Sequence, residues 1–309
     1  MPPPPQTIKQ PLDEGLRRET DEQNSISHGN DSASHAGQDQ ASFQSLGSHN
    51  NTSSASSIGP SPSNVSSQSQ QPPQKISVES PLPPMVQRLL GDRSNEKRKN
   101  AALEIEALIK SLQEANNTLM IQSVITVLGK DFCTSMNANY RKGGVLGLAA
   151  TAIGLMQNCP LYLDMLLPPV LHCTDDPEAR VRYYACESLY NIAKVSRMHI
   201  LQHFNQLFDG LTKLFADVDL DVKKGASLLD RLIKDIVTEN ESFNVEQFLP
   251  LLQNYIRRTN PYIRQLLVGW ITVLDSIPDV SMIDYLPDFL DGLFNVSDTC
   301  NATVKKKLV

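Results

Sequence analysis

The residues whose types and spacing come closest to a metal-binding pattern are His199 and His203. Four residues apart on a helix, two imidazoles lie on the same face, which is the arrangement of zinc-binding H-E-x-x-H motifs. Here Ile200 stands in the place of the glutamate, and the sequence indicates no third ligand. We therefore expect exposed or half-buried histidines at these positions and no metal site.

The other reactive side chains form no recognised catalytic pattern. The run GGVLG at 143–147 lacks the spacing of a P-loop or a dinucleotide-binding loop, and no strand is predicted before it. The sequence contains no G-x-S-x-G, and His28, His35 and His49 lie far from any predicted core. Carboxylates recur regularly at predicted turns, where they suit helix caps better than an acid-base pair. We expect a protein that is not an enzyme and holds no cofactor.

Five cysteines are irregularly spaced, and no two of them form a C-x-x-C pair. This pattern argues against a disulfide framework or a zinc module and suits a reducing compartment. We expect them to be buried as small apolar side chains. They are Cys133, Cys159, Cys173, Cys186 and Cys300.

Net charge and apolar runs bear on two further classes of protein. The 309 residues carry a net charge of −6, and nucleic-acid binding needs clustered Lys and Arg, so no nucleic-acid partner is expected. The N-terminus lacks the apolar segment of a signal peptide. The uncharged run 143–163 is interrupted by Gln157, Asn158 and Pro160 before about 18 apolar residues accumulate, so it predicts a buried helix rather than a membrane span.

The elements that position these residues belong to one of two regions. Residues 1–80 contain 18 Ser, 10 Gln and 9 Pro. Such a segment cannot bury enough apolar surface to offset its ordering entropy, so a disordered head is predicted. In residues 81–309 the apolar positions follow the period of a helix, and no strand-like alternation is found. The expected fold class is therefore all-α.

A repeat of 41 residues organises the helical region. At the expected start of each second helix an apolar or aromatic residue precedes a basic one, and the first helix repeats its apolar columns in phase. Two-helix units with one apolar stripe per helix must stack on their neighbours, as in HEAT and armadillo α-solenoids. We expect about six such hairpins, the last one truncated. The pairs are Tyr140-Arg141, Val181-Arg182, Val222-Lys223, Ile263-Arg264 and Val304-Lys305, and the columns are Leu166, Leu207, Phe248 and Phe289, then Val170, Leu211, Leu252 and Leu293.

The recurring basic residue has two interpretations. It pairs with an acidic turn residue of the adjacent repeat, forming a ladder along the solenoid, or it belongs to an exposed row that meets an anionic partner such as a lipid headgroup. Asp175, Asp176, Asp219 and Asp221 lie in the same turns and favour the ladder. Asp176 and Asp217 are also expected to accept hydrogen bonds from free N–H groups at the helix starts.

One predicted helix carries Gly143, Gly144 and Gly147 among several alanines. Glycine costs about 1 kcal/mol relative to alanine in a helix interior, so something must offset this cost. Close approach of helices inside the solenoid is one explanation. A groove shaped for a partner helix is the other.

Three stretches carry a resemblance to a known family: RKGGVLGLAATAIGL at 141–155, RVRYYACESLYNIAKVSR at 180–197 and HFNQLFDGLTKLFADVDLDVKKGASLLDRLIKDIVTE at 203–239. With EKRKNAALEIEALIK at 96–110 and DYLPDFLDGLF at 284–294, they are similar to the N-terminal region of the Vac-type vacuole-morphology scaffolds. The resemblance covers residues 81–309 and leaves out the Ser/Gln/Pro-rich head.

The resemblance implies a non-catalytic scaffold at the cytosolic face of vacuole and endosome membranes, with peripheral membrane association. Such a scaffold binds and activates a Fab/PIKfyve-type phosphatidylinositol 3-phosphate 5-kinase and organises it with a Sac-domain phosphoinositide phosphatase, which controls phosphatidylinositol 3,5-bisphosphate synthesis. A generic protein-binding HEAT solenoid, such as a transport adaptor or a phosphatase scaffold, is the alternative. The chain ends at KKKLV within a predicted opening helical turn, so we expect a fragment that lacks the family's phosphatase-binding and self-association region.

By the same resemblance, the kinase-binding segment would fall at about residues 147–245. The candidate contacts are its basic and aromatic side chains near two predicted helix starts. An equally open interpretation divides the two adjacent tyrosines between the core and the surface of the solenoid. The candidates are Arg180, Arg182, Tyr183, Tyr184, Lys223 and Lys224.

Overall fold

The computed structural model describes residues 80–240, 243–277, 283–285 and 287. Within these ranges every regular element is a helix, which confirms the all-α class. The predicted head, apart from Ser80, lies outside the described residues. The α-helices are α2 (Pro84–Leu90), α3 (Asn95–Glu114), α4 (Thr118–Val127), α5 (Ala138–Leu155), α6 (Leu163–His172), α7 (Ala179–Ser196), α8 (Phe204–Phe215), α9 (Leu220–Thr238), α10 (Val245–Ile256) and α11 (Pro261–Asp275). Short 3-10 or π-helical segments join them, namely η1 (Leu128–Phe132), η2 (Met156–Tyr162), η3 (Cys173–Asp175) and η4 (Arg197–His203).

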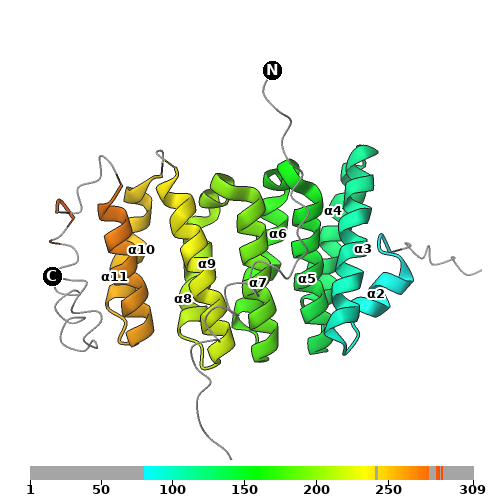
Figure 1. Cartoon of the computed structure of the whole chain (residues 1–309), viewed down its shortest axis with the longest axis horizontal. Coiled ribbons are helices and arrows are strands. Elements are labelled where there is room, and N and C mark those ends of the chain that lie inside the picture. Colours follow the sequence, from blue (N-terminus) through cyan, green and yellow to red (C-terminus); the bar gives the residue numbers. More distant parts are fainter. Residues whose placement is uncertain (1–79, 241–242, 278–282, 286, 288–309) are drawn as a thin grey trace, which may run out of the picture. The chain divides into compact units, whose positions relative to one another are not determined.

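Successive helices form hairpins that stack in two layers (Figure 1). The long helices α3, α5, α7, α9 and α11 lie in one layer, and α4, α6, α8 and α10 lie in the other. Contacts between long helices are most extensive from α3 to α9 and are much sparser between α9 and α11. This is the nearest-neighbour packing of HEAT- and armadillo-like arrays, so the predicted solenoid is confirmed for the described hairpins. The expected last hairpin, with Val304-Lys305, lies outside them.

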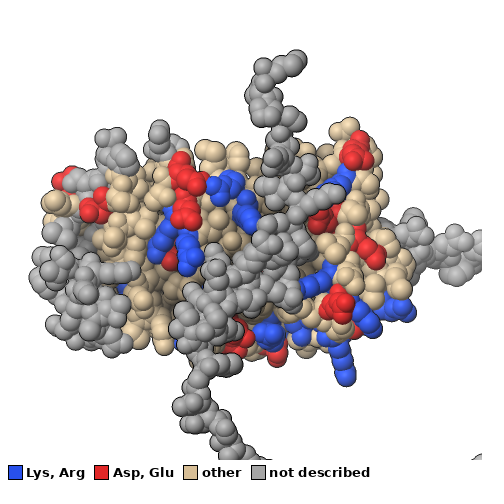
Figure 2. Space-filling model, viewed as in Figure 1, with Lys and Arg blue, Asp and Glu red and all other residues tan. Residues whose placement is uncertain are grey.

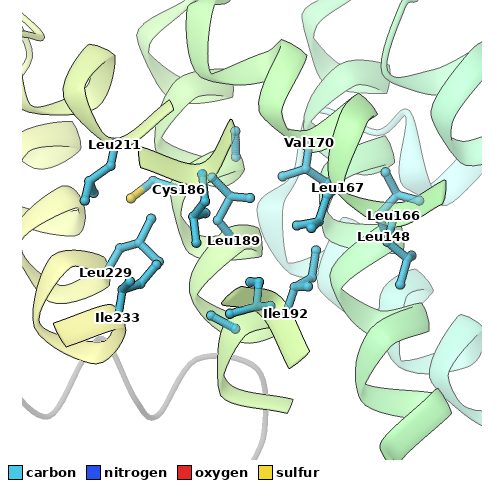
Figure 3. Packing of buried hydrophobic residues seen from close by; sticks show 14 of the residues in the cluster. Leu148, Leu166, Leu167, Val170, Cys186, Leu189, Ile192, Leu211, Leu229 and Ile233 are labelled. Atoms are coloured by element: carbon cyan, nitrogen blue, oxygen red, sulfur yellow. The ribbon is translucent and has the colours of Figure 1, made fainter. Parts of the chain in front are cut away.

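The predicted apolar columns form the core between the two layers (Figure 3). Leu166, Leu207 and Phe248 are each at most 1% exposed. Val181 and Val222 are fully buried at the starts of their helices. Burying a side chain of this size contributes about 1.5–3 kcal/mol, so the stacking of hairpins supplies the core that no single hairpin has.

Polar side chains define where the helices begin. Asp176 and Asp217 accept hydrogen bonds from the backbone N–H groups of Glu178 and Asp219, at 2.9 and 2.8 Å, as expected for acidic residues at these turns. Pro261 occupies the first turn of α11, where a missing N–H costs little. Caps of this kind are worth about 1 kcal/mol each. The N-cap side chains that accept a backbone N–H are Asn117, Asn137, Asp219, Asn244 and Asn260.

The glycines of α5 allow its neighbours to approach closely. A Cβ atom at Gly143 would lie 2.1 Å from the carbonyl oxygen of Leu90, and one at Gly154 would lie 2.9 Å from that of Glu106. The space beside these glycines is therefore filled by the protein's own helices. This confirms close helix packing as the reason for the glycines, rather than an open groove for a partner helix.

The apolar character of α5 also reflects burial. By length and composition alone, the helical run Ala138–Asp175 could cross a membrane, but 67% of its most apolar window is buried inside the structure. The run is interrupted by the 3-10 segment η2, which contains Pro160. The expected buried helix is confirmed at this position.

Candidate functional site

Two arginine–aspartate clamps join the three hairpins that contain α5, α7 and α9. Arg141 of α5 binds Asp176 of the following turn through Nε and Nη2, at 2.6 and 2.9 Å. Arg182 of α7 binds Asp217 in the same bidentate way, at 2.5 and 2.8 Å. In each case Nη1 donates to the carbonyl oxygen six residues earlier. The predicted ladder between adjacent repeats is confirmed at these two junctions.

The electrostatics of the clamps follow from this geometry. Burial raises the pKa of Asp217, but hydrogen bonds from Arg182 and from the backbone N–H of Asp219 outweigh it and hold that pKa below its ordinary value. The hydrogen bond to its aspartate raises the pKa of each guanidinium. Planar bidentate pairs of this kind fix orientation as well as charge. The clamps therefore hold α5, α7 and α9 in one register.

Within the described residues, no clamp is formed between the hairpins of α9 and α11. Lys223 occupies the position of Arg182 in the next repeat, but Arg258 stands where Asp217 would be repeated. No described carboxylate pairs with Lys223, and its ammonium lies over the ring of Tyr262, 3.6 Å from the ring centroid. The prediction of a carboxylate partner for the basic residue is wrong at this position, because the turn residue has changed sign.

An earlier arginine shares the backbone contact of the clamp arginines but forms no carboxylate pair, and the 41-residue spacing misses it. Arg98 of α3 donates from Nη1 to the carbonyl oxygen of Asp92, six residues earlier, as Arg141 and Arg182 do at the same distance in sequence. Arg98 precedes Arg141 by 43 residues, so a strict repeat of 41 residues does not align the two arginines. The signal that finds it is an arginine in the first turn of a helix that follows an acidic turn.

The predicted contact residues divide into exposed and structural groups. Arg180 is exposed, stacks on the ring of Tyr183 at 5.2 Å and forms a solvent-exposed ion pair with Asp221 at 3.4 Å. Lys224 is exposed on α9, and Lys223 and Tyr183 are half-buried. The guanidinium of Arg182, by contrast, is occupied by its clamp.

Tyr184 belongs to the structural group. It is 6% exposed, and its hydroxyl donates to Oδ1 of Asn95 at 2.7 Å, while its ring lies 5.7 Å from the guanidinium carbon of Arg98. The interpretation that divides the adjacent tyrosines between core and surface is therefore confirmed. Tyr184 ties α7 to α3 across the intervening helix α5, a contact between segments 89 residues apart that no local pattern indicates.

The histidines and cysteines considered as possible metal ligands lie outside the clamps. His199 is exposed and His203 is half-buried, 3.6 Å from an Asp164 carboxylate oxygen, and both line a hollow of about 520 Å³ beside the start of α10. In the described part of the chain, no three His, Cys, Asp or Glu side chains are grouped as a metal site. Four cysteines are free and buried as expected, and burial raises the pKa of Cys159 to about 12. Cys300 lies outside the described residues.

The arrangement as a whole suits protein binding. Figure 2 shows Lys and Arg interspersed with Asp and Glu on the visible described part of the face that carries the long helices. Mixed charges of this kind favour specific docking over non-specific attraction to a polyanion. The long-helix layer offers an extended surface on which such docking is geometrically possible.

Comparison with known proteins gives a match to this same part of the chain. Residues 139–235 match the family model described as the Vacuolar 14 Fab1-binding region. The chain is 51% identical over 228 residues to the Protein VAC14 homolog of Arabidopsis thaliana, covering 74% of this chain and 31% of that protein. It is 40% identical over 245 residues to the Vacuole morphology and inheritance protein 14 of Saccharomyces cerevisiae, covering 66% and 28%. The chain thus spans about a third of the length of the curated relatives that it matches.

The solved structures that match include designed armadillo repeat proteins. One matches 74% of this chain and 96% of its own length at 17% identity, with a TM-score of 0.41. A second, in complex with the peptide (KR)4, has 19% identity and the same TM-score. Both are likenesses of the fold alone.

Proposed function

Because the helical part of this chain belongs to the VAC14 family, we propose that it is a non-catalytic scaffold that binds a Fab1-type phosphatidylinositol 3-phosphate 5-kinase. One observation carries the proposal. The matched Fab1-binding region, residues 139–235, runs from the start of α5 almost to the end of α9. These are the hairpins that the two arginine–aspartate clamps join. A binding region and a rigidly registered block of helices therefore coincide in sequence.

The proposed kinase contacts are the exposed and half-buried members of the candidate set. Arg180 and Lys224 are exposed at the starts of α7 and α9, Lys223 is half-buried beside Lys224, and Arg180 lies over the ring of Tyr183. Arginine and tyrosine are enriched among the residues that carry binding energy at interfaces, which supports their selection. We assign Arg182 and Tyr184 the role of positioning residues, because one is held in a clamp and the other is buried against α3. The proposed segment remains 147–245.

The wider role of such a scaffold is also part of the proposal. It activates the kinase by holding it in position and brings it together with a Sac-domain phosphoinositide phosphatase. The complex acts at the cytosolic face of vacuole and endosome membranes. The names of the relatives, which refer to vacuole morphology, support this location.

A binding assay with purified kinase tests the proposal. We expect the 309-residue chain to retain the kinase, and Arg180→Glu or Lys224→Glu to weaken binding about tenfold or more, because each change places a carboxylate at a central contact. Lys130→Glu, exposed on η1 and outside the matched region, is the control with the same change of charge and should bind as the unmodified chain does.

Two results would overturn the proposal. One is that the kinase is not retained by a chain whose thermal unfolding shows it to be folded. The other is that an unrelated helical peptide competes with the kinase as effectively as the unlabelled chain does, which would indicate a generic protein-binding solenoid. A kinase assay with and without the chain separates binding from activation.

A further inference from the structure

Two adjoining hollows lie at the start of α8, in the layer of short helices. The first, of about 520 Å³, is lined by η4 and by the starts of α8 and α10. The second, of about 570 Å³, is lined mainly by α6 and α8. Asn205 and Gln206 line both hollows, so the two meet along α8. We call them together the α8 trough, and the lining residues that carry the argument are Gln202, Phe204, Asn205, Gln206, Phe243 and Gln247.

Carboxamide side chains recur along the exposed lining of the α8 trough. Gln202, Asn205 and Gln206 are exposed near the start of α8. Gln247 is exposed in the first turn of α10. Among the described contacts, none of these four side chains has a hydrogen-bond partner. A carboxamide has a donor and an acceptor, the same pair of groups that each peptide unit presents. The lining can therefore pair with the main chain of an extended peptide segment.

The lining of the α8 trough carries no unbalanced charge. Among its described residues the one carboxylate and the one ammonium group belong to Asp209 and Lys213, which form an ion pair at 3.3 Å. The other titratable side chains of the lining are His172, His199 and His203. A charged segment would lose water there without gaining an opposite charge, and that costs free energy. The trough therefore favours an uncharged segment.

Aromatic rings form an apolar patch in the first hollow. Phe243 is half-buried, and its ring centroid lies 5.1 Å from that of Phe204 and 6.4 Å from that of Phe248. The ring of Phe204 also packs against Trp270, at 5.2 Å. These contacts hold the ring of Phe243 in place, so its accessible part offers a fixed surface to an apolar side chain. A few polar groups around such a patch are typical of ligand sites.

The position of the α8 trough in the sequence points to the source of the segment. Most of its lining lies inside residues 139–235, which match the Fab1-binding region. That region contains the short helices α6 and α8 as well as the long helices that carry Arg180 and Lys224. None of the proposed kinase contacts lines the trough. The matched region therefore offers a second surface, on the other layer, to the same partner.

We propose that the α8 trough binds an extended, uncharged peptide segment of the kinase, with an apolar side chain of that segment packed on Phe243. The carboxamides pair with the main chain of the segment, and the aromatic patch selects its side chain. This inference rests on the proposed function and adds a contact on the short-helix layer to those on the long helices.

An isosteric substitution tests the α8 trough in the kinase-binding assay. Gln206→Glu keeps the shape of an exposed side chain but replaces its N–H donors by a carboxylate oxygen. We expect the variant to bind the purified kinase about tenfold more weakly, because a main-chain carbonyl group then faces a negative charge. Gln122→Glu is the matched control, since Gln122 is exposed on α4 and lies outside the matched region, and it should bind as the unmodified chain does.

The outcomes separate this inference from the proposed function. Equal affinity of Gln206→Glu and the unmodified chain, with binding still weakened by Lys224→Glu, overturns the α8 trough alone. Failure of the folded, unmodified chain to retain the kinase overturns the proposed function.

Peptides test the α8 trough without the intact kinase. Short overlapping peptides that cover the kinase sequence are arrayed and probed with the labelled 309-residue chain and with Gln206→Glu. We expect the unmodified chain to bind uncharged peptides that contain an aromatic or large aliphatic residue, and Gln206→Glu to lose this binding. No binding, binding only to charged peptides, or binding that Gln206→Glu retains overturns the inference. Peptides from residues 1–79 of the chain itself are included, and dependence on Gln206 for these alone would contradict the kinase as the source.

Discussion

At the scale of single residues, arginine and lysine in the same place have different effects. Arg182 carries a planar fork that binds both oxygens of Asp217, whereas Lys223 at the next position lies on an aromatic ring. A fork with a bidentate partner fixes one orientation, but an ammonium over a ring leaves more freedom. The repeats that carry both the arginine and the aspartate are therefore held in a fixed orientation relative to each other.

Replacing Asp217 by asparagine tests a clamp. We expect Asp217→Asn to lower the free energy of unfolding by about 1–3 kcal/mol near neutral pH, because the half-buried guanidinium of Arg182 loses its charged partner. Asp221→Asn is the matched control, since its pair with Arg180 is more than half exposed on both sides and should contribute little. Urea unfolding followed by circular dichroism measures both.

The same pair predicts a dependence on pH. The folded-state pKa of Asp217 lies below the ordinary aspartate value of 3.8, so its contribution is complete above 3.8 and is lost as the pH falls through the folded value. The difference in stability between the unmodified chain and Asp217→Asn should shrink in that acidic range. A difference that stays constant with pH would show that the carboxylate charge is not what stabilises the junction.

Met156 stores backbone strain at the end of α5. Its φ of +49° lies in the region that favours glycine, and its side chain is 56% exposed, so little packing is at stake. We expect Met156→Gly to raise the free energy of unfolding by about 1 kcal/mol through relief of this strain. Met156→Ala keeps the strain and should give no gain in the same urea titration. A loss of stability in the glycine variant would contradict the argument.

At the scale of elements, α5 depends on the absence of side chains. Gly143→Ala would place a Cβ atom 2.1 Å from a backbone oxygen of α2, so we expect a loss of about 1–3 kcal/mol where an ordinary helix would gain. Gly269→Ala on α11 is the control, because its Cβ would meet only the flexible end of Lys234 at 3.0 Å. Thermal unfolding of both variants measures the contrast, and equal effects would refute close packing as the reason for Gly143.

Sequence patterns predict these elements unequally well. The 41-residue spacing places Val181 and Val222 in the core and pairs Arg182 with an acidic turn, because both depend on neighbours at a fixed step along the chain. The position of Arg98 is not predicted, because Arg98 and Arg141 are 43 residues apart, two more than the 41-residue repeat. The contact of Tyr184 with Asn95 could not be predicted, because it joins α7 to α3 across an intervening hairpin and no local sequence pattern indicates it.

At the scale of the whole described region, the junctions between hairpins differ in how firmly they are held. The hairpins of α5, α7 and α9 are joined by two bidentate pairs and by extensive helix contacts, whereas α9 and α11 share few contacts and no clamp. In arrays of repeats, stability is a sum of units and their interfaces, so the weak interface should open first. Native-state hydrogen exchange should show amides of α11 opening at a lower free energy than those of α7. Uniform protection would argue against this division.

The clamped hairpins of α5, α7 and α9 are also the proposed binding surface for the kinase. Hydrogen exchange of the chain with and without purified phosphatidylinositol 3-phosphate 5-kinase tests it most directly. We predict new protection on α7 and α9, around Arg180 and Lys224, with little change on α2 and α4. Protection confined to α2 and α4, or none at a concentration at which the kinase binds, would contradict the account.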